Sequence, residues 1–271
     1  MKYWYTNLKN NIDFFIRSHI IFSRKNYTET GVNVTGVNVT GVNNAGGNIE
    51  NVFINDEQKD LYFSLKEKYD LTPLYKYNDI NFLTNLYYLD IFDKYILPDK
   101  KPISVLDIGS KNWNYAGSEH VFFKKFSDDL LLDGIELDAY RLCTNLYTRY
   151  EISKFYTKEL ENANYHAGDF MEHNRKYDYI IWILPFITEY PHLRWGLPLK
   201  YFNPEKMLGH AFELLNEGGE LLIMNQGENE YNIQKDLNNQ LKLKFEDIGE
   251  VNNIFSPFKN RRFCTIVKKY N

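Results

Sequence analysis

The sequence is poor in cysteine and has no long hydrophobic run, and each absence excludes a class of protein. Two cysteines in 271 residues, Cys143 and Cys264, are too few for a disulfide framework. They fall in a predicted helix and a predicted strand, so we expect buried thiols in the reducing cytoplasm. The best apolar run, residues 180–187, is far shorter than the ~20 residues that cross a bilayer. The N-terminus lacks the pattern of an export signal, so we expect a cytoplasmic protein without a membrane segment.

The sequence also lacks a strong excess of either charge. It holds 32 Lys and Arg residues against 36 Asp and Glu residues, a net charge of −4 at pH 7, and 44% of its residues are hydrophobic. This composition is typical of a globular protein with a sizeable core. Non-specific nucleic-acid binding depends on clustered Lys and Arg, so the acidic balance disfavours a protein that binds nucleic acid over its whole surface. A local basic patch is compatible with it.

Several catalytic motifs are missing as well. The six histidines and two cysteines show no metal-ligand spacing, and the sequence has no nucleophile elbow of the Gly-x-Ser-x-Gly type. Neither the Gly-x-Gly-x-x-Gly fingerprint of dinucleotide-binding enzymes nor a Gly-x-x-x-x-Gly-Lys-Ser/Thr phosphate loop occurs. We therefore expect chemistry without a metal ion, and a nicotinamide-dependent dehydrogenase is disfavoured.

The first 101 residues predict a helical cap rather than an independent fold. A Gly/Asn/Val repeat occupies about residues 28–48, and its turn-forming composition predicts a surface loop. Asn55 can cap a helix, with Gln58 completing a capping box, and a second helical pattern of apolar residues extends from Ile80 to Ile91. We place the end of this cap at residue 101.

Residues 102–271 alternate short apolar segments with helical ones, which predicts a doubly wound α/β domain. The expected strands lie at residues 103–108, 130–136, 164–167, 179–184, 220–224, 244–251 and 262–268. The last two have no helix between them, so we expect a seven-stranded, mostly parallel sheet with an antiparallel C-terminal strand. We also predict one helix that carries Leu142 and Leu146, and another that is capped by Asn203 and terminated by Gly218.

Ligands of such sheets bind beyond the carboxyl ends of the strands, so the residues at those ends are the first site candidates. Four strand ends carry glycines, acids or apolar residues in an ordered series. They are Asp107-Ile108-Gly109-Ser110, Gly134-Ile135-Glu136-Leu137-Asp138, Gly168-Asp169-Phe170, and the apolar strand that begins at Tyr177-Asp178 and ends at Ile183-Leu184. A Leu-Asn-Glu-Gly-Gly-Glu-Leu segment at residues 215–221 precedes the fifth strand.

In this order the motifs resemble the class I S-adenosylmethionine-dependent methyltransferase family over about residues 102–271. The resemblance implies a Rossmann-like fold and an enzyme that transfers a methyl group from S-adenosylmethionine, with S-adenosylhomocysteine as product. The cofactor-binding residues that it implies are Asp107, Gly109, Ser110, Glu136, Leu137, Asp169, Phe170, Ile183 and Leu184.

Each implied role agrees with the chemistry of the residue. Gly109 lets the backbone approach the methionyl carboxylate, while Asp107 would orient the loop and the cationic methionyl end. Glu136 would accept both ribose hydroxyls, as an acid does in dinucleotide folds. Asp169 would accept the adenine amino group beside Phe170. Main-chain carbonyls near the end of the fourth strand would receive the methionyl ammonium.

The loop after the first strand departs from the family pattern. Lys111 and Trp113 stand where the family has more glycines, and the spacing from Asp107 to Glu136 is 136 − 107 = 29 residues instead of the roughly 20 expected. Asp138 is therefore a rival to Glu136 for the ribose. If Lys111 or Trp113 fills the methionyl site, the fold would serve as a non-catalytic binding or scaffold protein. An aminopropyl transferase that uses the same fold is another alternative.

We expect the methyl acceptor beside the ends of the fourth and fifth strands, where long polar connections form candidate walls. The substrate-side candidates are Glu189, Tyr190, Trp195, Asn225, Gln226 and Glu228. His192 is the candidate catalytic base, and a loop histidine bonded to backbone is its alternative. Leu184-Pro185-Phe186 replaces the Asn/Asp-Pro-Pro-Tyr/Phe motif for planar amino groups, so we favour a small-molecule acceptor over a nucleobase. Nucleic acid or protein as acceptor and the oligomeric state stay open.

Overall fold

The computed structural model describes residues 3–19, 52–77, 79–99 and 101–270. The repeat predicted to form a loop at about residues 28–48 lies outside the described residues. No helix within the described ranges combines the length and apolar character that a membrane crossing requires.

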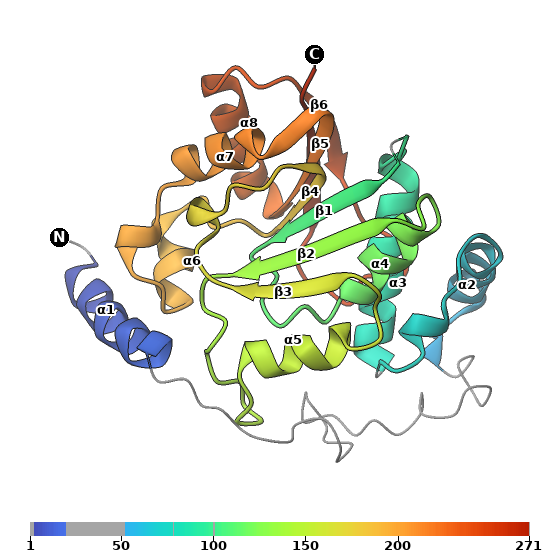
Figure 1. The fold of residues 1–271 in the computed structure, drawn as a ribbon, viewed down its shortest axis with the longest axis horizontal. Coiled ribbons are helices and arrows are strands. Elements are labelled where there is room, and N and C mark those ends of the chain that lie inside the picture. The colour runs from blue at the N-terminus through green and yellow to red at the C-terminus, as the bar shows by residue number, and fades with distance from the viewer. Residues whose placement is uncertain (1–2, 20–51, 78, 100, 271) are drawn as a thin grey trace.

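A seven-stranded sheet forms the centre of the molecule (Figure 1). Its strands are β1 (Ile103–Ile108), β2 (Leu130–Glu136), β3 (Ala163–Ala167), β4 (Tyr177–Ile183), β5 (Leu215–Gln226), β6 (Phe245–Glu250) and β7 (Arg262–Lys268). They lie in the order β3-β2-β1-β4-β5-β7-β6, with β7 antiparallel to both its neighbours and β1 to β5 parallel. The predicted Rossmann-like sheet is confirmed, and the chain changes direction across the sheet between β1 and β4, where ligands of such folds bind.

Helices cover both faces of the sheet because successive residues of a buried strand point to opposite sides. Val105 belongs to one apolar cluster, which includes residues of α3 (Asp79–Tyr95), α4 (Ala116–Lys124) and α5 (Arg149–Thr157). Its neighbour Leu106 belongs to a second cluster, packed with α7 (Pro204–Glu213), while α8 (Gly227–Gln240) borders that cluster through Leu237. The doubly wound arrangement thus follows from strands that are apolar on both faces.

The N-terminal helices occupy two separate places. α2 (Asp56–Lys68) begins as predicted at Asn55, whose side chain accepts the N–H of Gln58 at 2.9 Å, and a short turn η2 (Thr72–Leu74) leads into α3. α2 and α3 share the apolar cluster that contains Val105. α1 (Trp4–His19) lies on the far side of the molecule from α2, next to α6 (Glu189–Arg194) (Figure 1). The predicted helix after Asn55 and the predicted helical pattern from Ile80 to Ile91 are confirmed as α2 and α3.

The predicted helix with Leu142 and Leu146 is wrong. Both side chains are exposed, Leu142 forms an isolated antiparallel bridge with Thr148, and Leu146 has a φ of +65°. Helix α5 starts only at residue 149, because Thr148 and Glu151 form a capping box there. Cys143 consequently lies in a loop instead of a helix, whereas Cys264 lies in β7 as expected.

The predicted helix end at Gly218 is also wrong. α7 stops at Glu213, β5 already starts at Leu215, and Gly218 lies within that strand with a φ of +71°. The Gly218 N–H donates to the Lys269 carbonyl at 2.8 Å, so this glycine serves strand pairing instead of ending a helix. Two single-turn 3₁₀ helices complete the fold, η3 (Phe170–Glu172) and η4 (Leu199–Tyr201).

A Gly134→Ala substitution should destabilise the protein. A methyl group at 134 would lie 2.8 Å from atoms of the fully buried Trp113 ring, closer than real side chains approach. Overpacking of this kind costs about 1–3 kcal/mol. Urea unfolding should show a lower midpoint, while Gly209→Ala in α7, where nothing lies within 4 Å, should leave it unchanged or raise it. Equal midpoints for the parent and Gly134→Ala would contradict this packing.

Candidate functional site

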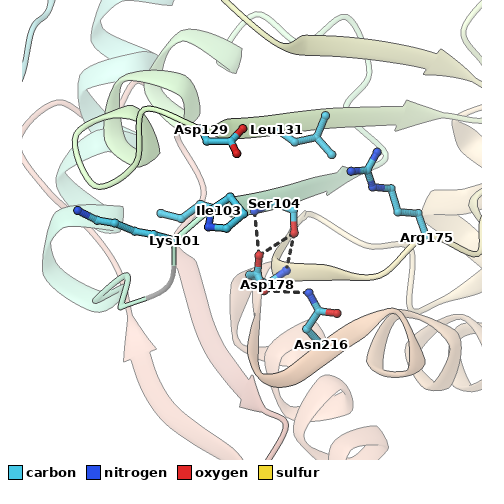
Figure 2. Close-up of a pocket in the computed structure, with 9 residues that line it drawn as sticks. Lys101, Ile103, Ser104, Asp129, Leu131, Arg175, Asp178 and Asn216 are labelled. Atoms are coloured by element: carbon cyan, nitrogen blue, oxygen red, sulfur yellow. Dashed lines mark hydrogen bonds between the residues drawn. The ribbon is translucent and has the colours of Figure 1, made fainter.

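A polar hollow of about 610 Å³ lies at the amino edge of the parallel strands (Figure 2). Asp178 of β4 dominates it, but its carboxylate is already hydrogen-bonded. It accepts the Ser104 N–H at 2.9 Å, the Ser104 hydroxyl at 2.7 Å and the Asn216 amide at 2.8 Å. These bonds join β1, β4 and β5, so Asp178 is a structural clamp at the edge opposite the one where ligands of such sheets bind.

A larger cavity of about 790 Å³ lies at the carboxyl edge, within the roughly 300–1,000 Å³ typical of small-molecule sites. Most of the predicted site residues line it. They are Gly109, Glu136, Leu137, Asp169, Phe170, Ile183, Leu184, Tyr190, His192, Trp195 and Gln226. The remaining predicted residues do not line it: Asp107, Ser110, Glu189, Asn225 and Glu228.

Gly109 forms the floor of this cavity at the end of β1. Its φ of +71° favours glycine, and an added methyl group would enter open space with no atom within 4 Å. The N–H groups of Gly109 and Ser110 donate to the Ile135 carbonyl at 2.8 and 3.2 Å. β2 therefore already uses both amides, and neither N–H is free to donate to a ligand carboxylate.

Glu136 is the acid that faces the cavity from the end of β2. Its Oε1 accepts the Asp138 N–H and the Arg149 guanidinium, both at 2.9 Å, and its Oε2 accepts the Lys111 N–H at 2.9 Å. A carboxylate oxygen can accept two hydrogen bonds, so Oε2 retains room for one ligand hydroxyl instead of two. The rival Asp138 does not line the cavity, because it pairs with Arg17 at 2.5 Å.

Asp169 lies at the end of β3 and caps the short helix η3. Its Oδ1 accepts the Met171 N–H at 3.0 Å, whereas none of the hydrogen bonds among described residues uses Oδ2. The ring of Phe170 beside it packs against Trp182 with centroids 5.9 Å apart. An acceptor oxygen next to an aromatic surface suits a planar ring that carries an amino group.

Asp107 lies beneath the cavity and not in its wall. It is fully buried next to Glu119, Tyr115 and Trp113, and the Trp113 indole N–H donates to Glu119 at 2.8 Å. Burial raises the pKa of Asp107 to about 7, and burial with the nearby Asp107 charge raises the pKa of Glu119 well above its usual range. The predicted contact of Asp107 with a methionyl end is thus replaced by a buried acid pair that supports the loop.

The two bulky loop residues take different positions. Trp113 is fully buried against Gly134 and does not line the cavity, so it leaves the space at Gly109 open. Lys111 does line the cavity, and its ammonium lies 5.2 Å from the centre of the Trp195 ring. The Arg149 guanidinium lies 5.5 Å from the same ring centre. Two cations therefore hold Trp195 over the end of β2.

The connection after β4 forms a wall that α1 holds in place. The Asn10 amide donates to the carbonyls of Leu193 and Leu197 at 2.8 and 3.1 Å. Arg17 donates to the Gly196 carbonyl at 2.6 Å while it also pairs with Asp138. The outer wall of the cavity is thus fixed to the rim of the sheet by a helix distant in sequence.

His192 lies in this wall and is buried. Its Nε2 donates to the Pro198 carbonyl at 2.9 Å, so His192 makes the backbone hydrogen bond that was the alternative to a role as base. Burial lowers the pKa of the imidazole. The neutral ring therefore retains only Nδ1 as a nitrogen that could take a proton. Its role as a base stays a prediction.

The residues that the sequence analysis did not place in the cavity wall include Tyr88, Arg149, Phe258 and Arg262. Two of them had a signal in the sequence. The Thr148-x-x-Glu151 capping box places Arg149 in the first turn of a helix that follows β2. The antiparallel last strand begins with Arg262, so its pairing with β5 brings this residue opposite Gln226, at the ligand edge of the sheet. Tyr88 and Phe258 reach the cavity only through tertiary packing.

No protein-family profile matches the sequence, and no curated protein matches it. Solved structures similar to the chain include a methyltransferase from Pyrococcus furiosus, with 16% identity over 69% of this chain and 84% of that one and a TM-score of 0.49. The strand order and the antiparallel β7 define a Rossmann-like fold.

Two further solved structures have similar values. A SAM-dependent methyltransferase from Aquifex aeolicus has 12% identity over 66% of this chain and 87% of that one, with a TM-score of 0.46. A precorrin-6y C5,15-methyltransferase from Geobacter metallireducens has 9% identity over 67% of this chain and 88% of that one, with a TM-score of 0.45. At these identities the likeness concerns the fold alone.

The buried acid pair predicts a pH-dependent stability. The folded chain holds a proton near Asp107 up to about pH 7, whereas the unfolded chain releases it near pH 4. The free energy of unfolding should therefore decrease as the pH rises from about 4 to 7. Glu119→Gln, whose amide can donate to Asp107, should flatten this decrease, so its Tm at pH 8 should exceed that of the parent by a few degrees.

Differential scanning calorimetry between pH 5 and pH 8 measures this effect. Glu205→Gln, an exchange at an exposed position of α7, is the matched control and should follow the parent at every pH. A parent protein whose Tm stays constant over this range would contradict the raised pKa of Asp107.

Proposed function

We propose that the protein is an S-adenosylmethionine-dependent methyltransferase that acts on a small molecule. One observation carries the proposal: Gly109, Glu136 and Asp169 lie at the ends of three neighbouring strands and line a single cavity. An open backbone position, an acid at the end of β2 and an acid at the end of β3 match, in order, the groups that the methionyl, ribose and adenine parts would require. The fold of the chain agrees with this activity without establishing it.

The side chains fit the cofactor with one change from the sequence-based expectation. Asp169 Oδ2 would accept the adenine amino group, and Glu136 Oε2 would accept one ribose hydroxyl. The open space at Gly109 would take the methionyl chain. Because the Gly109 and Ser110 amides are engaged, the carboxylate would need another donor, and the Lys111 ammonium in the cavity wall can supply one.

The cofactor supplies an electrophilic methyl group on a sulfonium. The protein's own contribution is to align an acceptor with that group and to exclude water. Tyr190, Trp195 and Gln226 line the side of the cavity formed by the connection after β4 and by the end of β5. They are our proposed acceptor-side residues, whereas Glu189, Asn225 and Glu228 lie outside the wall. A base is needed only for an acceptor that must lose a proton, and neutral His192 would be the candidate.

The covering of the cavity favours a small acceptor. Trp195 is held over the end of β2 by two cations, and α1 fixes the adjoining segment through Asn10 and Arg17. α3 covers the other side of the same cavity with Ile80, Thr84 and other side chains. A polymer would have to displace these contacts, whereas a small molecule fits between them.

Ligand-dependent thermal unfolding tests the proposal. S-adenosylhomocysteine at 100 times its dissociation constant should increase the free energy of unfolding by about 2.7 kcal/mol. NAD and ATP should produce no comparable shift, because the chain lacks their phosphate-binding loops. No shift with either S-adenosylmethionine or S-adenosylhomocysteine would favour the scaffold alternative, and a shift with decarboxylated S-adenosylmethionine alone would favour an aminopropyl transferase.

An Asp169→Asn substitution should weaken S-adenosylhomocysteine binding. Asparagine keeps the helix cap but loses an acceptor for the adenine amino group. Loss of a hydrogen bond to a charged group costs about 1.5–3 kcal/mol, or roughly 10- to 100-fold in affinity. Isothermal titration calorimetry measures this change.

The matched control is Asp178→Asn at the opposite edge of the sheet. It disturbs the clamp on Ser104 and should lower stability by about 1–3 kcal/mol, yet leave the dissociation constant unchanged. If Asp169→Asn binds as tightly as the parent, the adenine contact lies elsewhere.

A further inference from the structure

Arg262 is a buried cation in the cavity wall that no carboxylate neutralises at close range. Only 6% of its surface is exposed, and it forms no ion pair within 4.0 Å with any described residue. Among the described residues, Glu230 is the acid whose charge acts on Arg262, and its carboxylate instead accepts the Gln226 N–H at 3.2 Å. A buried guanidinium costs several kcal/mol unless a partner compensates it, so its presence at a cavity calls for a ligand.

The donors of Arg262 are used on one edge only. Nη1 donates to the Asn260 carbonyl at 3.2 Å, whereas Nε has no hydrogen-bond partner and none of the described hydrogen bonds uses Nη2. Nε–H and one Nη2–H project from the same edge of the guanidinium plane, which is the edge that binds a carboxylate through two parallel hydrogen bonds. The unused donors thus match a planar anion.

The surroundings of Arg262 show which kind of molecule would carry this anion. Its guanidinium lies 4.5 Å from the centre of the Phe258 ring, and Phe258 packs against Tyr88 with centroids 6.2 Å apart. All three side chains line the cavity. The contact with Phe258 restrains the guanidinium and places an aromatic surface next to it.

The position of Arg262 separates this subsite from the proposed cofactor groups. Arg262 begins β7 opposite Gln226, the last residue of β5. Three strand spacings, about 14 Å, separate β7 from β1 and its Gly109 loop. A carboxylate at Arg262 would therefore belong to the acceptor and not to the methionyl group.

From these contacts we infer that the acceptor is a small aromatic or apolar molecule with a carboxylate group, and that Arg262 binds this carboxylate on its Nε and Nη2 edge. That this molecule is the methyl acceptor rests on the proposed function. The carboxylate subsite itself stands on the geometry of Arg262, so it can be tested whether or not the cofactor binds.

Fluorine NMR with 4-fluorobenzoate and the neutral 4-fluorobenzamide tests the subsite. Titrations are made with the parent protein in the presence and absence of S-adenosylhomocysteine. The benzoate should bind at least about 10-fold more tightly than the benzamide, and Arg262→Gln should remove this difference while S-adenosylhomocysteine binding stays within twofold of the parent. Arg262→Lys keeps the charge but not the two parallel N–H donors, so it should lose most of the preference for benzoate over benzamide.

Two controls separate a ligand site from a structural role. The neighbouring Arg261→Gln, at an exposed position where Arg261 pairs with Glu250, should leave benzoate binding unchanged. Arg262→Met removes a cation without a close partner, so its Tm without ligand should equal or exceed that of the parent. A lower Tm would mean that Arg262 serves the fold through Phe258 and Asn260, and would overturn the inference.

The remaining outcomes are also decisive. Equal binding of benzoate and benzamide, no binding of either, or benzoate binding that survives Arg262→Gln would each reject the carboxylate subsite. Inorganic phosphate that binds in an Arg262-dependent way without any benzoate binding would reject the carboxylate and indicate a phosphate-bearing ligand. Arg262-dependent benzoate binding without any response to S-adenosylhomocysteine would reject the proposed function and leave the subsite intact.

Discussion

The indole ring of Trp113 fills the space above Gly134, and the loop after β1 depends on this contact. The ring is fully buried, its N–H donates to Glu119, and the backbone at Lys111 and Trp113 adopts positive φ values of 56° and 48°. Because the largest side chain of the loop points into the core, the backbone at Gly109 remains open to the cavity. A loop with few glycines can thus still leave room for a ligand.

Buried charge organises the rim around this loop. Glu136 is held between Arg149 and the backbone amides of Lys111 and Asp138, while Asp138 is held by Arg17 from α1. Each acid at the end of β2 therefore has its own cation, in agreement with the high cost of an unpaired buried charge. The acidic balance of the whole chain conceals this local set of arginines, which lie around the cavity and not over the outer surface.

The sequence predicted the fold well because its signals are local. Strand β1, strand β7 and the helix starts at Asn55 and Asn203 follow from apolar runs and capping side chains that are adjacent in sequence. The predicted helix at Leu142 failed for a tertiary reason. Its leucines have helical spacing, yet residues 139–148 form a loop whose Arg141 joins Asp138 to the Trp195 carbonyl.

By itself the sequence determined the seven strands, the mostly parallel character of their sheet and the placement of Gly109, Glu136 and Asp169 at strand ends, because a short apolar run and its end can be recognised within a few residues. Only the tertiary structure decided that Asp107 lies under the cavity, that Glu136 is paired with Arg149 and that the buried Nε of Arg262 lacks a hydrogen-bond partner. Burial and ion pairing join residues that are far apart in the chain. They depend on which segments pack together, and no local pattern records that.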